Sequence, residues 1–599
     1  MLIDPRNECL IKVDCRWSYL ALSYVWGGQQ GLQLTKANRA RLFKPGSLGK
    51  DSGIPNVIRD AMNVAKRIDP LHFEESVVLK HDKDGVGYGE YRREHLLLWV
   101  DQLCITQDDV VDKAIQIQQM GHVYTEALAT IVAIDTQDCN DHLYRSPNSA
   151  RDIDSMVPDP SGMRVSNTGQ VVKNIGGLRL LAALPHLNQI LRNSKWMTRA
   201  WTLQEQDASG AAIYFSKSQV YFHCSKQTKQ EDIFTEHFEQ YRQLKGCIQY
   251  PHTNFQYPEE LYGRQRPTEN HWPQSWDVFT GLVENYMQRQ MTYSTDILNA
   301  FRGVAEYMHN VMGWDMTNCF PTDVLDYSLL WRPASMMRRR VMTSSPNISA
   351  SPVPEPPTYA WAAWSGHVTY KPYNAYLKSL VESFKRRTAN GRTKRITRYG
   401  QRWSDPDTDR DIQPDGPYGP RDASGLEIYG YSMEMVSKAR ERLRHRAFSA
   451  GWTDRSSKVG SGDGPFVLQF RAQCMDVRLI PADRSGEDAG GATQLLLNRE
   501  GKKIGFVWHV PLVDELGLTG GTAKCLLLSK YKTSKELLDQ WVDIMGSEAE
   551  HMPVIDQYDL INIMLVHHVP GKDVAERLTI GKIHEKYVNE AWEDLIKLA

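Results

Sequence analysis

The sequence predicts an α/β N-terminal domain, a helical middle region and a β-rich C-terminal α+β domain. Over residues 1–225, apolar runs typical of strands alternate with segments whose apolar residues follow helical spacing. From about 272 to 340 the spacing is helical, whereas short apolar runs typical of strands dominate 465–599. A chain of 599 residues is too long for one hydrophobic core, so we expect several domains.

The first domain opens with two strands and two helices. YLALSY at 19–24 predicts a short strand that ends in a Trp-Gly-Gly loop. A helix is predicted after Pro55, because apolar residues recur there at helical spacing and proline suits a first turn. The apolar run LLLWV at 96–100 is typical of a strand buried on both faces. The loop DQLCITQDD then leads into a second helix, whose predicted buried stripe is Ile117, Met120, Tyr124 and Ala127.

A third strand, ATIVAI at 129–134, precedes an insertion at about 135–190 in which Asn174 to Arg192 predicts a helix. The stretch WMTRAWTLQE at 196–205 predicts another helix, and 211–224 alternates like one or two strands. Alternating strands and helices indicate a parallel sheet covered by helices on both faces. Because ligands bind such sheets beyond the carboxyl ends of the strands, the Trp-Gly-Gly and DQLCI loops are the candidate binding loops.

The rest of the chain contains two predicted linkers. A helical region is expected over 226–343, with one apolar face formed by Ile297, Phe301, Val304 and Met308. The segments 344–357 and 385–425 are rich in proline, serine or charge, a composition that buries too little apolar surface to offset chain entropy. Residues 426–599 form the predicted C-terminal domain, which a helix at about 586–599 should close.

Charge and cysteine content narrow the range of functions. Lysine and arginine total 71 and aspartate and glutamate 72, so no overall field attracts nucleic acid or a membrane surface. The sequence starts without the pattern of a signal peptide, and no apolar run reaches the roughly 18 residues needed to span a bilayer. The nine cysteines form no Cys-x-x-Cys pair, so we expect no metal site and a cytoplasmic protein with reduced thiols.

Two tempting motifs have ordinary explanations. GVGYG at 85–89 precedes a predicted strand, whereas the glycine fingerprint of a dinucleotide site follows one. Cys104 lies in the loop after the 96–100 strand, where the following helix start could lower its pKa and make it a nucleophile. The alternative for Cys104 is a plain core residue, because free cysteine is among the most buried residue types.

Three segments resemble the signature blocks of the fungal heterokaryon incompatibility (HET) domain, namely 19–28, 96–134 and 196–205. Three further segments resemble sequences that accompany this domain, at 289–305, 359–368 and 558–583. The resemblance implies a fungal protein in non-self recognition and regulated cell death. HET domains are in turn distantly similar to Toll/interleukin receptor (TIR) domains, which have a flavodoxin-like fold. Many TIR domains hydrolyse NAD with the glutamate of a W-x-x-x-E arrangement, and they lack an insertion like the one at 135–190.

Trp201-Thr-Leu-Gln-Glu205 matches that arrangement, so the resemblance implies that Glu205 is catalytic and that NAD is a substrate rather than a bound cofactor. Cleavage of the nicotinamide–ribose bond passes through an oxocarbenium-like transition state, which a nearby carboxylate stabilises. Trp201 would share a helix face with Glu205. We expect Trp26 to contact a nucleotide ring and Asp101 to bind a ribose hydroxyl. Glycines at positions 27 and 28 would let the backbone approach a phosphate.

Each of these residues also has a structural alternative. The tryptophans would be core residues, Asp101 would position its loop, and Arg199 and Glu205 would form plain ion pairs. The corresponding alternative function is a non-enzymatic signalling module that self-associates or binds a protein partner. The enzyme hypothesis requires Glu205 at the carboxyl end of the sheet near Trp26 and Asp101, whereas the module hypothesis allows it to face solvent or an arginine.

Overall fold

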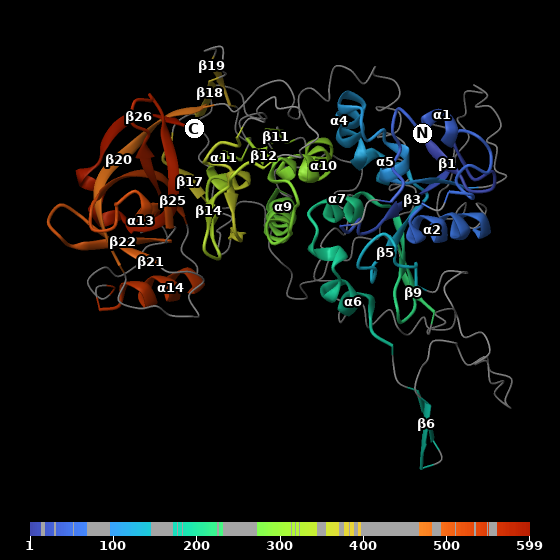
Figure 1. Cartoon of the computed structure of the whole chain (residues 1–599). Helices are drawn as coiled ribbons and strands as arrows, with labels where there is room; N and C mark the ends of the chain where they lie inside the picture. Colours follow the sequence, from blue (N-terminus) through green and yellow to red (C-terminus); the bar gives the residue numbers. More distant parts are fainter. Residues whose placement is uncertain are drawn as a thin grey trace, which may run out of the picture.

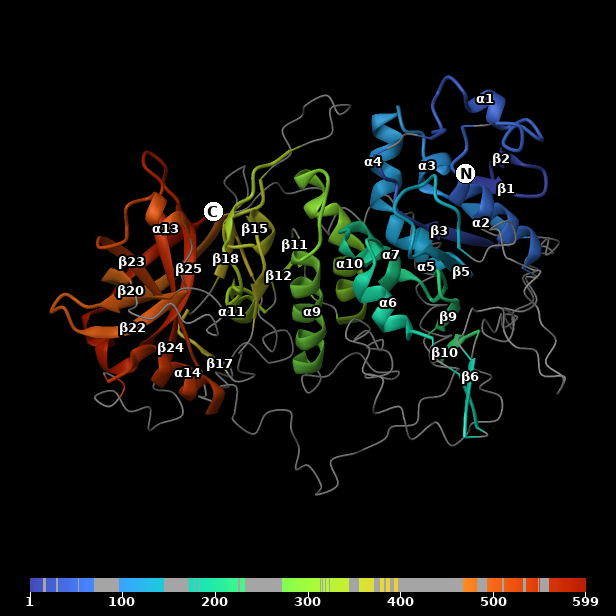
Figure 2. The ribbon, with the colours of Figure 1, turned by 60° about the horizontal axis from the view of Figure 1, so that its bottom comes forward.

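The computed structural model arranges the chain as an α/β domain, a helical middle region and a β-rich C-terminal region, with the middle region between the other two (Figure 1, Figure 2). The described residues are 1–13, 18–28, 31–51, 53–68, 96–144, 172–176, 178–181, 184–224, 227–231, 272–312, 314, 316–317, 319–322, 324–343, 355–370, 377–381, 384–387, 393–396, 467–481, 493–508, 511–531, 535–547, 549 and 560–599. The GVGYG motif at 85–89 and most of the predicted linkers lie outside these residues.

The N-terminal domain is built on an eight-stranded mixed sheet of order β10-β9-β8-β5-β3-β4-β1-β2. Its strands are β1 (Leu2–Asp4), β2 (Cys9–Ile11), β3 (Tyr19–Ser23), β4 (Leu97–Trp99), β5 (Ala129–Ala133), β8 (Ala211–Phe215), β9 (Val220–Cys224) and β10 (Gln227–Gln230). The central strands β8, β5, β3 and β4 run parallel, which confirms that part of the prediction. Both edges are antiparallel: β1 pairs with β2, and β9 pairs with both β8 and β10. The short turns after β1 and β8 reverse the chain without a crossover helix.

Helix α2 (Asn56–Arg67) begins after Pro55, as predicted, and buries an apolar face against the sheet. The helix expected after the DQLCITQDD loop is instead two helices, α4 (Val110–Gln118) and α5 (Met120–Glu126), interrupted at Gln119. A short helix, α3 (Asp101–Cys104), precedes them. The α5 part of the predicted stripe is buried, whereas α4 buries no residue.

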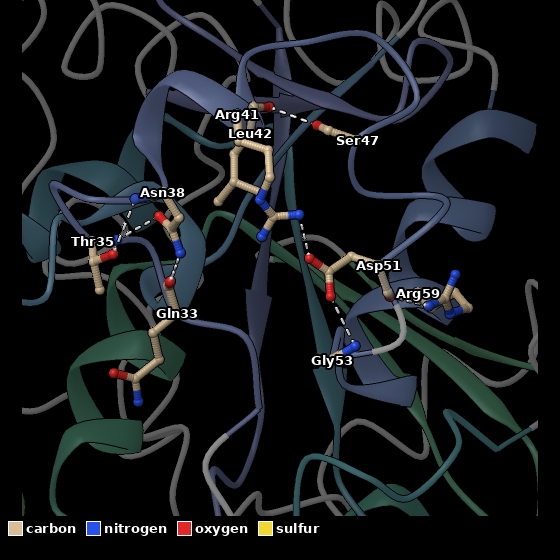
Figure 3. A network of polar contacts seen from close by, with 9 residues as sticks. All are labelled: Gln33, Thr35, Asn38, Arg41, Leu42, Ser47, Asp51, Gly53 and Arg59. Atoms are coloured by element: carbon tan, nitrogen blue, oxygen red, sulfur yellow. Dashed lines mark hydrogen bonds and ion pairs between the residues drawn. The ribbon is translucent and has the colours of Figure 1, made fainter.

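The segment between β3 and α2 is fixed by local polar contacts (Figure 3). Asn38 beside helix α1 (Arg39–Leu42) donates from its amide to the carbonyl of Gln33 at 2.7 Å. Arg41 pairs with Asp51 at 2.7 Å, and the other carboxylate oxygen of Asp51 accepts from the backbone of Gly53 at 2.9 Å. These contacts give the chain leaving the Trp-Gly-Gly loop a defined path to α2.

The insertion contains less helix than the sequence predicts. Residues 172–175 and 178–181 pair as the hairpin β6 (Val172–Ile175) and β7 (Leu178–Leu181), which stands away from the rest of the molecule (Figure 1, Figure 2). Among the described residues of 172–193, helix α6 spans Leu187–Asn193, so the prediction of a helix from Asn174 is wrong at its start. The chain then forms a 3-10 turn at Trp196–Thr198 and helix α7 (Trp201–Ala208).

The middle region is helical in its first part, as predicted. It contains α9 (Trp272–Met287), two 3-10 turns at Ser294–Ile297 and Asn299–Phe301, α10 (Arg302–Met312) and α11 (Leu325–Ser328). The predicted apolar face is buried at each of its four positions, Ile297, Phe301, Val304 and Met308. Two-residue strands complete the region, namely β11 (Met316–Thr317), β12 (Phe320–Pro321), β13 (Arg332–Pro333), β14 (Arg338–Arg339), β15 (Trp364–Ser365) and β16 (Val368–Thr369).

The C-terminal region is a ten-stranded sheet, antiparallel except for the β25–β26 pair, in which β20, β21, β22, β25, β24 and β23 close into a ring. Its strands are β17 (Leu377–Ser379), β18 (Phe384–Arg387), β19 (Thr393–Arg395), β20 (Val467–Pro481), β21 (Thr493–Leu497), β22 (Lys503–Trp508), β23 (Thr522–Tyr531), β24 (Leu560–His568), β25 (Ala575–His584) and β26 (Trp592–Leu598). Two helices accompany the sheet, α13 (Pro511–Glu515) and α14 (Lys535–Met545). The predicted β-rich character of this region is therefore confirmed.

Two predictions for the C-terminal half are wrong. The expected final helix at 586–599 is a 3-10 turn at Glu585–Glu590 followed by strand β26, in which Ile596 and Leu598 face the core at strand spacing. The predicted linker at 385–425 begins inside the β18–β19 hairpin, because Phe384 packs against Phe470 of β20 and draws the basic segment into the sheet. Residues 397–425 lie outside the described part of the chain.

Candidate active site

The two candidate binding loops meet at one edge of the sheet. Strands β3 and β4 are adjacent and parallel, so the segments that follow them emerge side by side. Trp26 Nε1 donates a hydrogen bond to Asp101 Oδ2 at 2.8 Å, which joins the Trp-Gly-Gly loop to the start of α3. The other carboxylate oxygen of Asp101 accepts from the backbone of Gln102 at 2.7 Å. The two candidate loops therefore lie together in the structure, and Asp101 also positions its own loop.

Glu205 lies at the same edge, against the last residue of β3. The Ser23 hydroxyl donates a hydrogen bond to Glu205 Oε2, and Trp196 Nε1 donates to the Ser23 oxygen at 2.7 Å. Glu205 is only 6% exposed and Ser23 1% exposed. The carboxylate therefore occupies the position that the enzyme hypothesis requires, and in this conformation it is covered by protein.

Burial dominates the electrostatics of Glu205. The pKa of this carboxyl is raised to about 7, mainly by loss of solvent and in smaller part by the nearby charge of Asp101. The positive charges of Arg199 and Arg289 and the hydrogen bond from Ser23 act in the opposite direction on the same pKa. Burial also raises the pKa of Asp101, against the bond from Trp26. Glu205 thus changes its charge within the physiological pH range, unlike an ordinary surface glutamate.

Arg199 supplies positive charge to the cluster without forming a simple ion pair with it. Its Nη1 donates to the carbonyl oxygen of Tyr24 at 2.6 Å, and its charge acts to lower the pKa of Asp101 as well as that of Glu205. The Tyr24 hydroxyl in turn donates to Gln102 Oε1 at 2.6 Å. Three half-exposed residues, Trp26, Asp101 and Arg199, therefore border a more deeply buried carboxylate.

The two glycines of the loop have different surroundings. Gly27 has a φ of +75°, and a Cβ atom placed on it would lie 2.3 Å from Cβ of Asp138. The backbone amide of Cys139 donates to the carbonyl of Trp26 at 3.3 Å, so the start of the insertion packs closely on this loop. Gly28 is exposed, with open space where a Cβ would be. Packing within the chain explains Gly27, and the space beside Gly28 is the kind that a phosphate needs.

Trp201 is directed toward the middle region. Its Nε1 donates to Asp296 Oδ2 at 3.4 Å, and its half-buried ring packs against the apolar cores of both the N-terminal domain and the middle region. The contacts of Trp201 therefore favour a structural role, whereas Trp26 remains at the candidate site.

Several residues of the cluster were not predicted from the sequence: Ser23, Tyr24, Gln102, Trp196 and Arg289. A polar residue at the end of an otherwise apolar strand was a signal for Ser23. Arg289 lies 84 positions beyond Glu205 in the printed sequence, and no local pattern connects the two.

Cys104 is a core residue. It is 1% exposed, and its sulfur accepts from the backbone amide of Val100 at 3.4 Å. Burial raises the pKa of its thiol to about 11, so the thiolate that a nucleophile requires is scarce at neutral pH. The structure therefore favours the core alternative for Cys104.

The described ranges contain neither a cluster of metal-binding side chains nor a membrane-spanning helix. Within them, no group of three or more histidine, cysteine, aspartate or glutamate side chains is arranged to hold a metal ion. No helix in the same ranges has the length and apolar character needed to cross a bilayer.

The fold and the cluster define an α/β domain that carries a buried carboxylate at the carboxyl end of its sheet. Residues 19–205 match the family described as heterokaryon incompatibility protein (HET), so this chain carries a HET domain. The chain is also similar to heterokaryon incompatibility protein 6, OR allele, of Neurospora crassa, with 31% identity over 119 residues. That match covers 19% of this chain and only 14% of the relative. No solved structure matches the chain.

Proposed function

We propose that this HET-domain protein acts in fungal non-self recognition and regulated cell death by hydrolysing NAD at the cluster around Glu205. The HET match and the similarity to an incompatibility protein of Neurospora crassa support the biological role. The single observation that carries the chemistry is the position of Glu205, buried at the carboxyl end of a parallel sheet beside the loops of Trp26 and Asp101. A TIR-like origin of the site is part of the same proposal.

The reaction needs charge stabilisation more than proton transfer. Nicotinamide leaves as a neutral base, while positive charge develops on the ribose. A carboxylate held away from water stabilises that charge better than one in solvent, typically by a few kcal/mol. In this mechanism Glu205 acts in its ionised form, Asp101 binds a ribose hydroxyl, Trp26 stacks on a ring, and Arg199 faces a phosphate.

Substrate access requires a change from the described conformation. Ser23 occupies one oxygen of Glu205, and Trp196 covers Ser23. A ribose can reach the carboxylate only when α7 or the turn before it moves away from β3. We therefore propose that the described arrangement is a closed state and that an activating event opens it, as suits a toxic activity.

Intracellular NAD provides a test in a host cell. We expect expression of the full chain in a fungal host to lower NAD and viability, and Glu205→Gln to preserve both. Glu593→Gln is the control, because the carboxylate of Glu593 pairs with Arg471 on the C-terminal sheet and takes no part in the cluster. Equal toxicity of the wild type and Glu205→Gln, with NAD unchanged in both, would exclude the proposed chemistry.

A second candidate function, the non-enzymatic interaction module, is favoured by the surface of α4. This helix buries no residue and exposes Val110 (46%), Val111 (70%) and Ile115 (48%). Exposed apolar patches of this kind mark protein-binding surfaces. If this function is the principal one, Val111→Glu combined with Ile115→Glu will abolish toxicity and self-association in sedimentation, whereas Glu205→Gln will change neither.

A further inference from the structure

Helix α7 connects the candidate site to the middle region. The backbone amide of Ala200 donates to the carbonyl of Gln290 at 2.8 Å, and that of Gln290 donates to the carbonyl of Thr198 at 2.5 Å. Ala200 and Leu203 belong to the hydrophobic core of the middle region, although they lie within the HET-matched segment. Glu205, on the same helix, contacts the sheet instead. Any movement of the middle region relative to the sheet must therefore break contacts of α7 with one of them or displace α7.

Arg289 is a middle-region residue that contacts the start of α7 through its side chain. It follows α9, is 8% exposed, and is anchored by a bond from Nε to Asn285 Oδ1 at 2.8 Å. Its Nη1 donates to the Thr202 hydroxyl at 2.9 Å and to the carbonyl of Arg199 at 3.3 Å. Arg289 thus holds the first turn of α7 from outside the segment that matches the HET family.

The charge of Arg289 acts on two buried carboxylates of α7. Burial raises the pKa of both Glu205 and Asp207 to about 7, and the positive charge of Arg289 opposes each shift. In the described part of the chain, Asp207 Oδ2 is buried without a hydrogen-bond partner. The other groups that act on Glu205 are Ser23 on β3, Arg199 before α7 and Asp101 on α3. The hydroxyl of Tyr124 on α5 also senses the charge of Glu205.

We propose that Arg289 is a positioning residue for Glu205, so that the middle region completes and controls the candidate site of the HET domain. Arg289 acts through α7: it fixes the first turn by hydrogen bonds and stabilises the ionised form of the carboxylates that follow. Withdrawal of the middle region removes this charge and releases the first turn at the same time. The link between Arg289 and NAD cleavage rests on the proposed function. The coupling between Arg289 and Glu205 does not depend on it.

A second contact allows the position of α7 to be changed without a change in charge. The backbone amide of Gly303 on α10 donates to Gln204 Oε1 at 3.0 Å. A Cβ atom on Gly303 would lie 2.8 Å from Cδ of Gln204 and 2.9 Å from Cγ. Gly303→Ala must therefore displace the Gln204 side chain, and with it the register of α7 against the middle region.

The test uses the full chain and a double-mutant cycle between Arg289→Gln and Glu205→Gln. Urea midpoints are measured for the four proteins at pH 5.5 and pH 8. We expect clear non-additivity at pH 8, where Glu205 is ionised, and little at pH 5.5, where it is protonated. Arg340→Gln is the matched control, because Arg340 is a middle-region arginine bonded to the carbonyls of Ala362 and Trp364. Its cycle with Glu205→Gln should be additive at both pH values.

A second readout connects the coupling to the reaction. Arg289→Gln should shift the pH midpoint of nicotinamide release upward by about one unit, as expected when an opposite charge is removed. Gly303→Ala should lower the rate without that shift, and Arg289→Lys should retain most of the wild-type midpoint.

Additive midpoints at pH 8 would overturn the inference, whether or not NAD is cleaved. Coupling at pH 8 without any nicotinamide release from the wild type would instead overturn the proposed function and leave the positioning role intact. If Arg289→Gln does not fold, the cycle is run with Arg289→Met, which also removes the charge but keeps a long side chain. Additive midpoints at pH 8 for Arg289→Met with Glu205→Gln would again contradict the inference.

Discussion

Ser23 donates a hydrogen bond to the carboxylate of Glu205, which joins the end of β3 to the middle of α7. Trp196 donates to the same serine oxygen at 2.7 Å, and Trp26 of the neighbouring loop reaches Asp101 after β4. The three segments that resemble HET signature blocks therefore meet at one edge of the sheet. Segments that are far apart in the sequence are thus held together by contacts between their side chains, which is a physical reason for them to occur together.

Glu205→Gln should change how stability depends on pH. The folded state holds its proton up to about pH 7 and the unfolded chain releases it near 4.5, so stability falls as pH rises between these values. The loss is complete above pH 7 and is on the order of 3 kcal/mol. In urea unfolding from pH 5 to 8, the variant should lose less stability than the wild type, although Asp207 retains a similar dependence.

Glu593→Gln is the control for this measurement, because the carboxylate of Glu593 is half exposed in a pair with Arg471. It should retain the wild-type slope of stability against pH. An unchanged slope for Glu205→Gln would mean that the carboxyl of Glu205 titrates like an exposed one.

Gly27→Ala and Gly28→Ala should differ sharply. Alanine at position 27 must adopt a φ of +75° and overlap Asp138, because its Cβ would lie 2.3 Å from the aspartate Cβ. We expect a loss of at least about 1–2 kcal/mol in the free energy of unfolding. Gly28→Ala meets open space and should remain within about 0.5 kcal/mol of the wild type. Equal urea midpoints for the two variants would contradict the positive φ of Gly27 and its close approach to Asp138.

Trp26→Phe should cost more stability than its small change in apolar area suggests. It removes the 2.8 Å hydrogen bond to the half-exposed carboxylate of Asp101, and the loss of such a bond typically costs about 1 kcal/mol. Trp201→Phe serves as the comparison, because its Nε1 is farther from its acceptor, at 3.4 Å from Asp296. Thermal unfolding of the two variants measures the difference, and a smaller loss for Trp26→Phe would argue against the Trp26–Asp101 contact.

The rate of NAD cleavage should rise with pH through about 7, as Glu205 becomes ionised. Because the bond from Ser23 lowers the pKa of this carboxyl, Ser23→Ala should move the midpoint of the pH–rate profile upward by about one unit. Steady-state rates of nicotinamide release between pH 5.5 and 9 provide the measurement. A profile that falls with pH would assign the ionising group a different role.

Local pattern was sufficient to predict the parallel core of the sheet and α2. The β1–β2 hairpin was missed because each strand has only three residues, too few for a periodic signal. The C-terminal strand β26 was mistaken for a helix because Ile596 and Leu598 take their alternation from pairing with β20, a segment more than 100 positions earlier. Long-range pairing of this kind has no local signature.

The candidate site was predictable only in part for the same reason. Glu205 was identified through the W-x-x-x-E arrangement, and Trp26 and Asp101 through their positions after strands. Trp201 was misjudged as a neighbour in the site because helical spacing does not reveal that Asp296 lies beside it. Arg289 could not be predicted, since its effect on Glu205 arises from the packing of α9 and α7 in space.

Nicotinamide release from NAD by the purified full chain at pH 8 tests the central claim most directly. We expect measurable release by the wild type and by Glu593→Gln, and no release above background by folded Glu205→Gln. Release at the wild-type rate by Glu205→Gln would contradict the assignment of Glu205. Absence of release from the wild type would contradict the enzyme hypothesis itself.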